Sequence, residues 1–243
     1  STPIKSSAAS DVYKRQYQYL IYKEYLEHSP FEKLQVHLRQ ERLLPRTIDN
    51  YTLSRIFSAA YSDLRESQSN NHYFISMRDV AVLELLFATG VRVSELCSIT
   101  CENLNLQNQV VLIKGKGSKE RCIYISSPPV ISALASYSAL RTTIDSPDPY
   151  FFLNRDKHRL SEQSVRRIIC RYTPTDAAHY TPHMFRHSFA TYLWEQCGNI
   201  YEVKEILGHS SVKTTERYVH ASFEQQKRIL TTMHPRNTLK IEF

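Results

Sequence analysis

The chain has 243 residues, a net charge of +7 and a pI near 9.1, a length that suits one large domain or two small ones. Hydrophobic residues make up 42% and charged residues 23%, and the longest apolar stretch, residues 80–93, contains Glu84 and Arg92. These values exclude a disordered chain and argue against a membrane protein. The basic charge favours a polyanionic partner, most simply nucleic acid.

Glycine and cysteine usage narrow the class further. Only 5 glycines occur, about a third of average usage, which disfavours glycine-rich nucleotide loops and predicts a mainly helical protein. The 5 cysteines form no CxxC pair, so neither a disulfide framework nor a zinc cluster is indicated and no metal is expected. The sequence shows no signal peptide, and we expect a cytoplasmic protein.

The first part of the chain has little regular pattern. Residues 1–16 are small and polar without a period, and we predict a disordered tail there. Residues 17–28 predict a short aromatic-rich helix that ends before Pro30. After a charged stretch, the Leu44-Pro45 step predicts a boundary.

From residue 47 onward, apolar positions recur at helical spacing. The pattern predicts helices at 50–66 and 78–88, the second apolar nearly all round and therefore buried, with Gly90 at its C-terminal end. Another short helix starts near Ser94. Further helices are predicted at 129–140, 161–171, 182–197, 200–207, 211–219 and 222–232.

Between these helices the period changes to that of strands. Residues 109–114 and 121–126 predict two short strands, and the loop GKGSKE between them predicts a β-hairpin. The predicted fold class is therefore mainly α with a small antiparallel β-hairpin or sheet (α+β).

Three stretches concentrate side chains that bind phosphate or transfer protons. ATGVRVSEL (88–96) places Arg92 just past a buried helix, where an arginine by itself is usually an ion-pair partner. GKGSKER (115–121) places Lys116 on the hairpin loop, where a lysine alone is usually only solvated. TPHMFRHSFATYL (181–193) places His183, Arg186 and His187 in the first turns of a helix, whose N-terminus already favours an anion.

A further segment, LGHSSVKTTERYVH (207–220), contains His209 after a predicted helix end and Tyr218 beyond it. Each is weak by itself, because a histidine there can cap a helix and most of the 16 tyrosines should make packing contacts. In order, however, the residues resemble the catalytic motif of the tyrosine recombinase (phage integrase) family, most closely its Xer-like and integrase-type members. The matching residues are Arg92, Lys116, His183, Arg186, His209 and Tyr218, and the resemblance covers about residues 44–234.

The resemblance implies the tyrosine recombinase catalytic-domain fold and a site-specific DNA recombinase or integrase. Such an enzyme cleaves and rejoins DNA strands through a covalent 3′-phosphotyrosine intermediate, with Tyr218 as nucleophile and Lys116 as general acid. Because the phosphoester energy is kept in the protein–DNA link, neither ATP nor a metal is required. The sequence agrees, since it contains no GxxxxGK[ST] loop and no carboxylate cluster.

The remaining motif residues would hold the phosphate. Two guanidiniums, those of Arg92 and Arg186, can stabilise the charge that develops on its oxygens. His183 and His209 would donate further hydrogen bonds, and His183 is also a candidate base for the tyrosine proton. Supporting roles fall to Glu95, which would orient Arg92, and to His187, which would buttress the helix. Backbone contacts to DNA, which set affinity and salt dependence, are expected from Lys114, Lys119, Arg121, Arg166 and Arg167.

Members of the family carry a helical DNA-clamping domain ahead of the catalytic domain. We expect residues 17–43 to be a remnant of it with its linker, 44–221 to be the catalytic domain, and 222–243 to be a C-terminal helix and tail. That helix either docks on its own domain or, as the resemblance implies, packs in trans on a neighbouring protomer. The implied partners are a double-stranded recombination site, further copies forming a homo-tetramer on DNA from monomers in solution, and an accessory recombinase or directionality factor.

Three other interpretations compete with recombination. They are a truncated, non-catalytic DNA-binding module, a type IB-like topoisomerase and a generic basic interaction protein. The complete motif argues against the first and third, because binding alone needs no tyrosine nucleophile, and the ATGxRxSEL and LGHSS segments favour recombination over the second. The DNA target, and the choice among integration, excision, dimer resolution and inversion, are not encoded in the motif.

Overall fold

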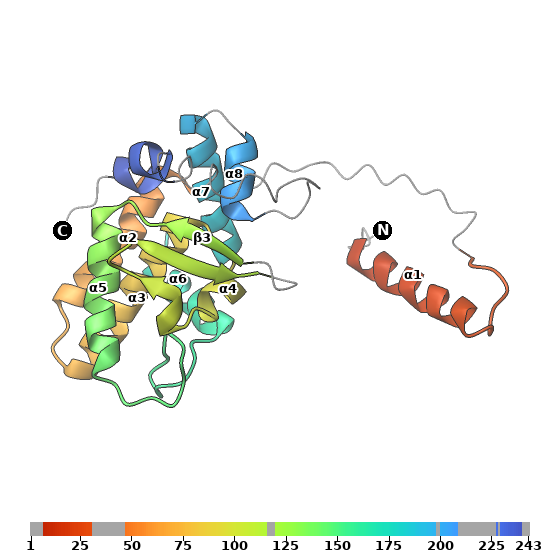
Figure 1. Cartoon of the computed structure of the whole chain (residues 1–243), viewed down its shortest axis with the longest axis horizontal. Helices are drawn as coiled ribbons and strands as arrows, with labels where there is room; N and C mark the ends of the chain where they lie inside the picture. The colour runs from red at the N-terminus through yellow and green to blue at the C-terminus, as the bar shows by residue number, and fades with distance from the viewer. Residues whose placement is uncertain are drawn as a thin grey trace. The chain divides into compact units, whose positions relative to one another are not determined.

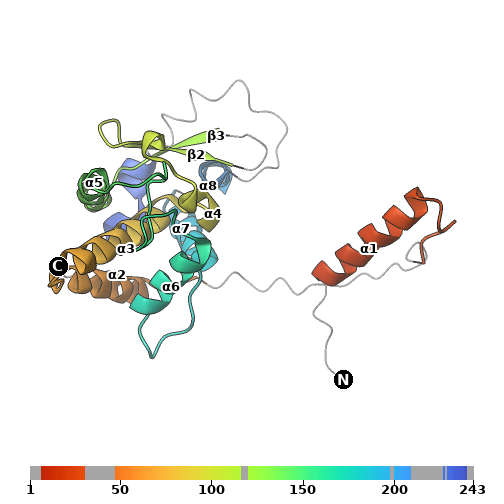
Figure 2. The ribbon, with the colours of Figure 1, turned by 90° about the horizontal axis from the view of Figure 1, so that it is seen from below.

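A computed structural model of the chain describes residues 7–30, 47–115, 120–197, 200–208, 227 and 229–239. The chain divides into two compact units, Ser1–Leu44 and Pro45–Phe243. The second unit consists of helices around one small sheet (Figures 1 and 2). The fold class predicted from the sequence is confirmed.

The first unit contains the helix α1 (Ser7–Tyr22). The tail predicted over residues 1–16 and the helix predicted over 17–28 are therefore wrong in their bounds. The early start reflects alanine-containing turns, which favour a helix by propensity and leave no apolar period to detect. The helix ends where it does because Glu24 adopts the left-handed conformation (φ 58°), and backbone hydrogen bonds close the last turn behind it.

The core of the second unit is built on α3 (Asn70–Thr89), whose residues 76–89 are all buried. It packs against α2 (Asn50–Arg65), α5 (Pro128–Thr142) and α7 (Pro182–Cys197), an arrangement visible in Figure 2. The buried helix predicted at 78–88 is confirmed, but α3 starts earlier, where Ser69 accepts a hydrogen bond from the His72 N–H. Its first turns are polar and partly exposed, so the apolar pattern did not reveal them.

A three-stranded antiparallel sheet lies beside these helices. Strands β2 (Val110–Lys114) and β3 (Glu120–Tyr124) form the predicted hairpin, with Val111 opposite Ile123. A third strand, β1 (Leu104–Asn105), pairs with β2 at the other edge. Its two residues are too few to show an alternating pattern, which is why the sequence did not indicate it.

The remaining helices match the predicted order. They are α4 (Val93–Cys97), α5 (Pro128–Thr142), α6 (Glu162–Tyr172), α7 (Pro182–Cys197) and α8 (Ile200–Leu207). Two 3₁₀ turns, Cys101–Asn103 and Pro235–Thr238, were not predicted. The helix predicted at 211–219 lies outside the described residues. Of the helix predicted at 222–232, residue 227 and residues 229–232 are described and are helical, and the helix continues to residue 233.

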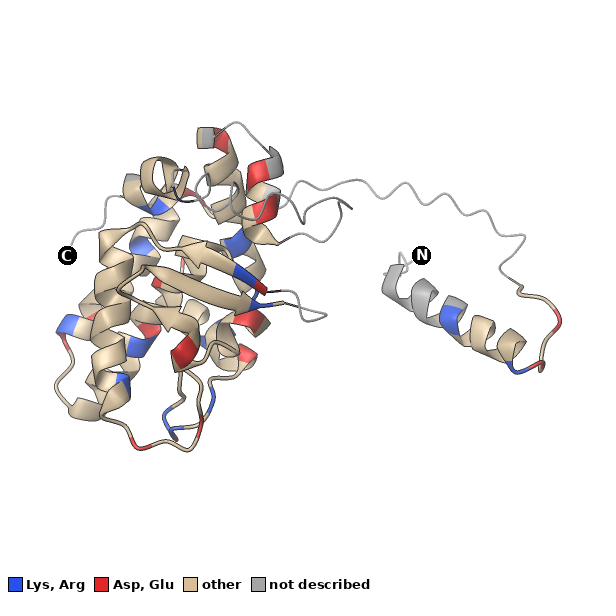
Figure 3. Ribbon diagram, in the orientation of Figure 1, with Lys and Arg blue, Asp and Glu red and all other residues tan. Residues whose placement is uncertain are grey.

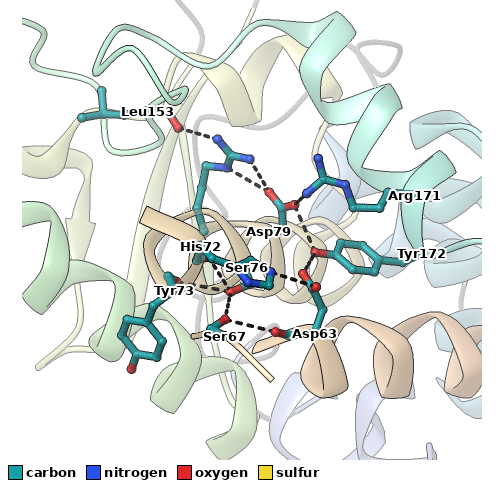
Figure 4. A network of polar contacts seen from close by, with 10 residues as sticks. Asp63, Ser67, His72, Tyr73, Ser76, Asp79, Leu153, Arg171 and Tyr172 are labelled. Atoms are coloured by element: carbon teal, nitrogen blue, oxygen red, sulfur yellow. Dashed lines mark hydrogen bonds and ion pairs between the residues drawn. The ribbon is translucent and has the colours of Figure 1, made fainter. Parts of the chain in front are cut away.

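A buried carboxylate, Asp79 on α3, connects three helices (Figure 4). It accepts hydrogen bonds from Arg78 and from Arg171 of α6, whose Nη1 lies 3.0 Å from Asp79 Oδ2. The Tyr172 hydroxyl lies 2.8 Å from Asp63 of α2 and 3.2 Å from Asp79. Burial raises the pKa of Asp79, and the two arginines act in the opposite direction. The network fixes α6 against α2 and α3.

The described part of the C-terminal segment, residues 229–239, packs on the second unit. Ile229, Leu230 and Leu239 are buried in its core, and the backbone oxygen of Leu230 accepts a hydrogen bond from Ser126 Oγ. Two arrangements were considered for the C-terminal segment. Its described residues dock on their own domain. Exchange with a neighbouring protomer stays a prediction.

Two polar contacts attach this segment to α3. Arg236 donates from Nε and Nη2 to the two oxygens of Glu84 at 2.9 and 2.7 Å, and both side chains are almost fully buried. The Tyr61 hydroxyl donates to the same carboxylate. Beside them, His234 Nε2 lies 2.7 Å from the backbone oxygen of Ala88, near the end of α3. The segment is thus held by the ion pair between Arg236 and Glu84 and by the hydrogen bond from His234 to Ala88.

Arg236→Met should destabilise the fold strongly, because it leaves Glu84 buried without its cation. We expect a loss of about 3–5 kcal/mol in the free energy of unfolding, measured by urea denaturation. In the double variant Glu84→Met/Arg236→Met the buried charge is gone, and much of that loss should be recovered. Equal stability of the single variant and the wild type would contradict this account.

The His234 ring should make the stability depend on pH. Burial lowers the pKa of His234 to about 4, while the unfolded chain binds this proton near pH 6.5. The neutral ring therefore contributes stability that is complete above pH 6.5 and is lost as the pH falls towards 4. The free energy of unfolding of His234→Gln should therefore fall less steeply between pH 7 and pH 4.5 than that of the wild type. Equal pH dependence in the two proteins would refute this role of His234.

Candidate functional site

Arg92 lies between the end of α3 and the start of α4. Its backbone N–H donates to Glu95 Oε2 at 2.9 Å and its Nη1 donates to Glu95 Oε1 at 2.8 Å. The predicted contact between Arg92 and Glu95 is therefore present. Because the Arg92 side chain remains 38% exposed, its guanidinium can contact a bound anion while one edge stays fixed by the carboxylate.

Glu95 binds a second arginine from the sheet. Arg121 on β3 donates from Nη1 to Oε1 at 3.1 Å and from Nη2 to Oε2 at 2.8 Å. Burial opposes the ionisation of Glu95, but the hydrogen bonds from Arg121 and from the Arg92 backbone outweigh it and lower the pKa of Glu95 to about 2. The carboxylate is thus charged at any working pH and bridges α4 to the hairpin.

Arg186 on α7 is almost fully buried and is held by backbone carbonyls. Its Nη1 donates to the oxygen of Gly90 at 2.6 Å and its Nη2 to that of Leu207 at 2.9 Å. Burial and the nearby charge of Arg92 lower the pKa of Arg186 to about 10, so it stays positive at neutral pH. The guanidinium therefore joins the end of α3 to the end of α8, with Arg92 within electrostatic reach.

His183 and His187 also lie on α7, and both are exposed. Partial burial, followed by the charges of His183 and Arg186, lowers the pKa of His187. Both rings are accessible at the surface, where a ligand can reach them.

The remaining motif residues Lys116, His209 and Tyr218 lie outside the described residues, as does Lys119. Their neighbours are described. Lys114 and Glu120 are paired at the ends of β2 and β3 that lead into the hairpin loop, and the ribbon in Figure 3 is coloured for basic and acidic residues at these ends. Gly208, which precedes His209, packs against Arg121: a Cβ atom on Gly208 would lie 3.0 Å from the Arg121 Nη1.

The predicted DNA contacts differ in exposure. Lys114, Arg166 and Arg167 are exposed, and Arg166 also forms a 3.3 Å ion pair with Glu162 on its own helix. Arg121 differs, because its side chain is only 16% exposed and is committed to Glu95. Sequence reasoning missed this pairing. The alternation along β3 contains the signal, since Arg121 shares a strand face with the buried residues Ile123 and Ile125.

Within the described ranges, no three His, Cys, Asp or Glu side chains are grouped as metal ligands would be. The described cysteines Cys97, Cys101, Cys122 and Cys170 are free thiols. No helix in the described part of the chain is both long and apolar enough to cross a membrane. What the site offers is a cluster of guanidiniums around one carboxylate, a donor set that suits a phosphate.

Comparison with known proteins identifies the family. Residues 61–225 match the model of the phage integrase family. A tyrosine recombinase of Agathobacter rectalis is 40% identical over 90% of this chain and 72% of its own length. Tyrosine recombinase XerC of Actinobacillus pleuropneumoniae is 32% identical over 96% of this chain and 73% of its own. The crystal structure of the XerH site-specific recombinase bound to its difH substrate matches with a TM-score of 0.57 at 25% identity, covering 77% of this chain and 50% of that one.

These matches define a class of enzymes, the tyrosine-type site-specific DNA recombinases, and the enzyme class predicted from the sequence is confirmed. The chain belongs to the phage integrase family. The family resemblance drawn from the order of the motif residues is thereby confirmed as well.

Gly90→Ala should damage the support of Arg186. Gly90 has φ +58°, and a Cβ atom there would lie 2.5 Å from Phe189 Cδ1 and 2.9 Å from Leu207 Cδ2. We expect a loss of roughly 2–4 kcal/mol in unfolding free energy from left-handed strain and overpacking, read as a lower urea midpoint. A midpoint unchanged from the wild type would show that the end of α3 can relax around the methyl group.

Proposed function

We propose that this protein is a site-specific DNA recombinase that cleaves and rejoins DNA strands through a covalent 3′-phosphotyrosine intermediate. The observation that carries the proposal is the approach of Arg92 and Arg186. They come from different helices, yet they lie close enough for the charge of one to lower the pKa of the other. Together with Arg121 they make three guanidiniums around the single carboxylate of Glu95, and the remaining positive charge favours the binding of a further anion.

The proposed anion is the scissile phosphate of double-stranded DNA. Attack on a phosphodiester adds negative charge to the non-bridging oxygens, and fixed guanidiniums stabilise that charge without reorganising. Arg92 is held by Glu95 and Arg186 by the carbonyls of Gly90 and Leu207. Both donors are therefore oriented before the substrate arrives.

The proposed covalent step exchanges one phosphoester bond for another. The Tyr218 oxygen attacks phosphorus and loses its proton to a base, for which His183 is the candidate, while the bond from phosphorus to the 5′ oxygen breaks. Lys116 gives a proton to that oxygen, which leaves as a free 5′-hydroxyl. His209 adds a hydrogen bond to the phosphate. Because a bond of equal kind forms as one breaks, the step calls for no ATP and no metal.

The proposed partners follow from the reaction. XerH has been crystallised on its difH DNA substrate, and we infer an equivalent double-stranded recombination site for this chain. Strand exchange between two sites requires a cleaving subunit for each strand, which favours a homo-tetramer on DNA assembled from monomers. An accessory recombinase or directionality factor and a cytoplasmic location belong to the same proposal.

A covalent adduct tests the proposed nucleophile. The protein is mixed with a pool of nicked, randomised duplex DNA, since a nick lets the cleaved fragment diffuse away and traps the intermediate. We expect protein–DNA adducts that survive SDS with the wild type and none with Tyr218→Phe. The exposed Tyr51→Phe variant is the matched control and should form adducts like the wild type.

Each outcome bears on one interpretation. An adduct that persists in Tyr218→Phe would overturn the tyrosine assignment. Salt-sensitive binding with no adduct from any protein would favour the non-catalytic DNA-binding module. Plasmid relaxation without exchange between two labelled copies of a trapped site would favour the topoisomerase, whereas exchange between them supports recombination.

A further inference from the structure

The role of Arg121 differs from that of a surface contact to DNA. Its side chain is 16% exposed, and both terminal nitrogens donate to the Glu95 carboxylate. The guanidinium also packs under the backbone at Gly208, where a Cβ atom would lie 3.0 to 3.1 Å from it. Its Nε–H is buried without a hydrogen-bond partner in the described structure. A DNA phosphate has little access to this side chain.

Glu95 depends on Arg121 for its orientation. Oxygen Oε1 accepts from Arg92 Nη1 and Arg121 Nη1, and Oε2 accepts from the Arg92 N–H and Arg121 Nη2. Four donors thus match the four lone-pair directions of one carboxylate. Without the two hydrogen bonds from Arg121, the carboxylate keeps donors from Arg92 alone and is freer to rotate about its last bond.

We propose that Arg121 is a positioning residue of the phosphate site, which holds the Glu95 carboxylate in the orientation that fixes Arg92. The inference rests on the proposed function, since it concerns the cleavage that Arg92 supports. It gives the hairpin a second role. The strand β3, which follows the loop that carries Lys116, then also supports the arginine at the start of α4.

The positioning role of Arg121 should be visible in the pH dependence of cleavage, because of the charges around Glu95. The groups that face it are Arg92 at the start of α4, Arg121 on β3 and Arg186 on α7. With Arg121 removed, the largest influence that lowers the pKa of Glu95 disappears while burial, which raises it, remains. Protonated Glu95 can no longer hold Arg92 by charge, so cleavage should weaken as the pH falls.

The experiment measures the rate of SDS-resistant adduct formation on a nicked duplex that carries a sequence recovered by trapping. Arg121→Met and Arg121→Lys are compared with Arg155→Met, which removes an exposed arginine from a loop outside the site. We expect Arg121→Met to slow adduct formation about 100-fold, as misplacement of a supporting group does, with Arg155→Met unaffected. The ratio of wild-type to Arg121→Met rates should grow between pH 7 and pH 5.

A double-variant cycle separates positioning from a general loss of structure. Because Arg121 acts through Glu95, the double variant Arg121→Met/Glu95→Gln should be no slower than the slower of its two single variants. The double variant also removes the buried carboxylate that has lost one of its two arginines, so it should fold even if Arg121→Met alone is unstable. Multiplied effects of the two substitutions would overturn the inference.

The affinity for the same nicked duplex distinguishes a positioning role from a direct phosphate contact. A positioning role leaves the affinity and its salt dependence unchanged in Arg121→Met, whereas loss of a phosphate contact weakens binding and lowers the salt slope by about 1. The second result, or wild-type rates in both Arg121 variants, overturns the inference and leaves the proposed function standing. An absence of adducts from the wild type itself overturns both.

Discussion

The C-terminal turn of α3 carries the carbonyl groups on which the site is built. The last carbonyls of a helix have no partner within it, and here two of them accept side-chain donors from distant parts of the chain. His234 binds the oxygen of Ala88, and Arg186 binds that of Gly90. One helix end therefore sets the position of α7, of the C-terminal segment and of the arginine at the centre of the site.

Buried carboxylates organise the rest of the unit, each with arginine partners. Glu84 holds Arg236, Asp79 holds Arg78 and Arg171, and Glu95 holds Arg92 and Arg121. Such pairs add little net stability, because desolvation of the charges offsets their attraction. They do specify which elements meet. At Glu95 one of the two arginines, Arg92, also remains exposed enough to meet a ligand.

Rigid placement of the arginines also suits the proposed attack on a phosphodiester. A guanidinium that is already oriented stabilises developing charge at no cost in reorganisation. Arg186 is held by two carbonyls and Arg92 by a carboxylate, so neither has to move far. The family to which the chain belongs supplies the reaction class, and the contacts of this chain supply the physical means proposed for it.

Much of this protein could be predicted from its sequence, because the relevant signals are local. The apolar run of 78–88 requires a buried helix, the alternation in 109–114 and 121–126 requires strands, and the spacing of His183 and Arg186 requires one helix face. The order of the motif residues along the chain identified the family without any knowledge of their contacts.

Only the tertiary structure decided which partners these residues have. Arg121 looked like a surface cation because its sequence neighbours are charged, yet its partner Glu95 lies on another element. The polar first turns of α3 and the attachment of Arg236 to Glu84 were equally hidden. For Arg121 and Arg236 the deciding contact joins residues far apart in the chain, and such a contact leaves no periodic trace in the sequence around either one.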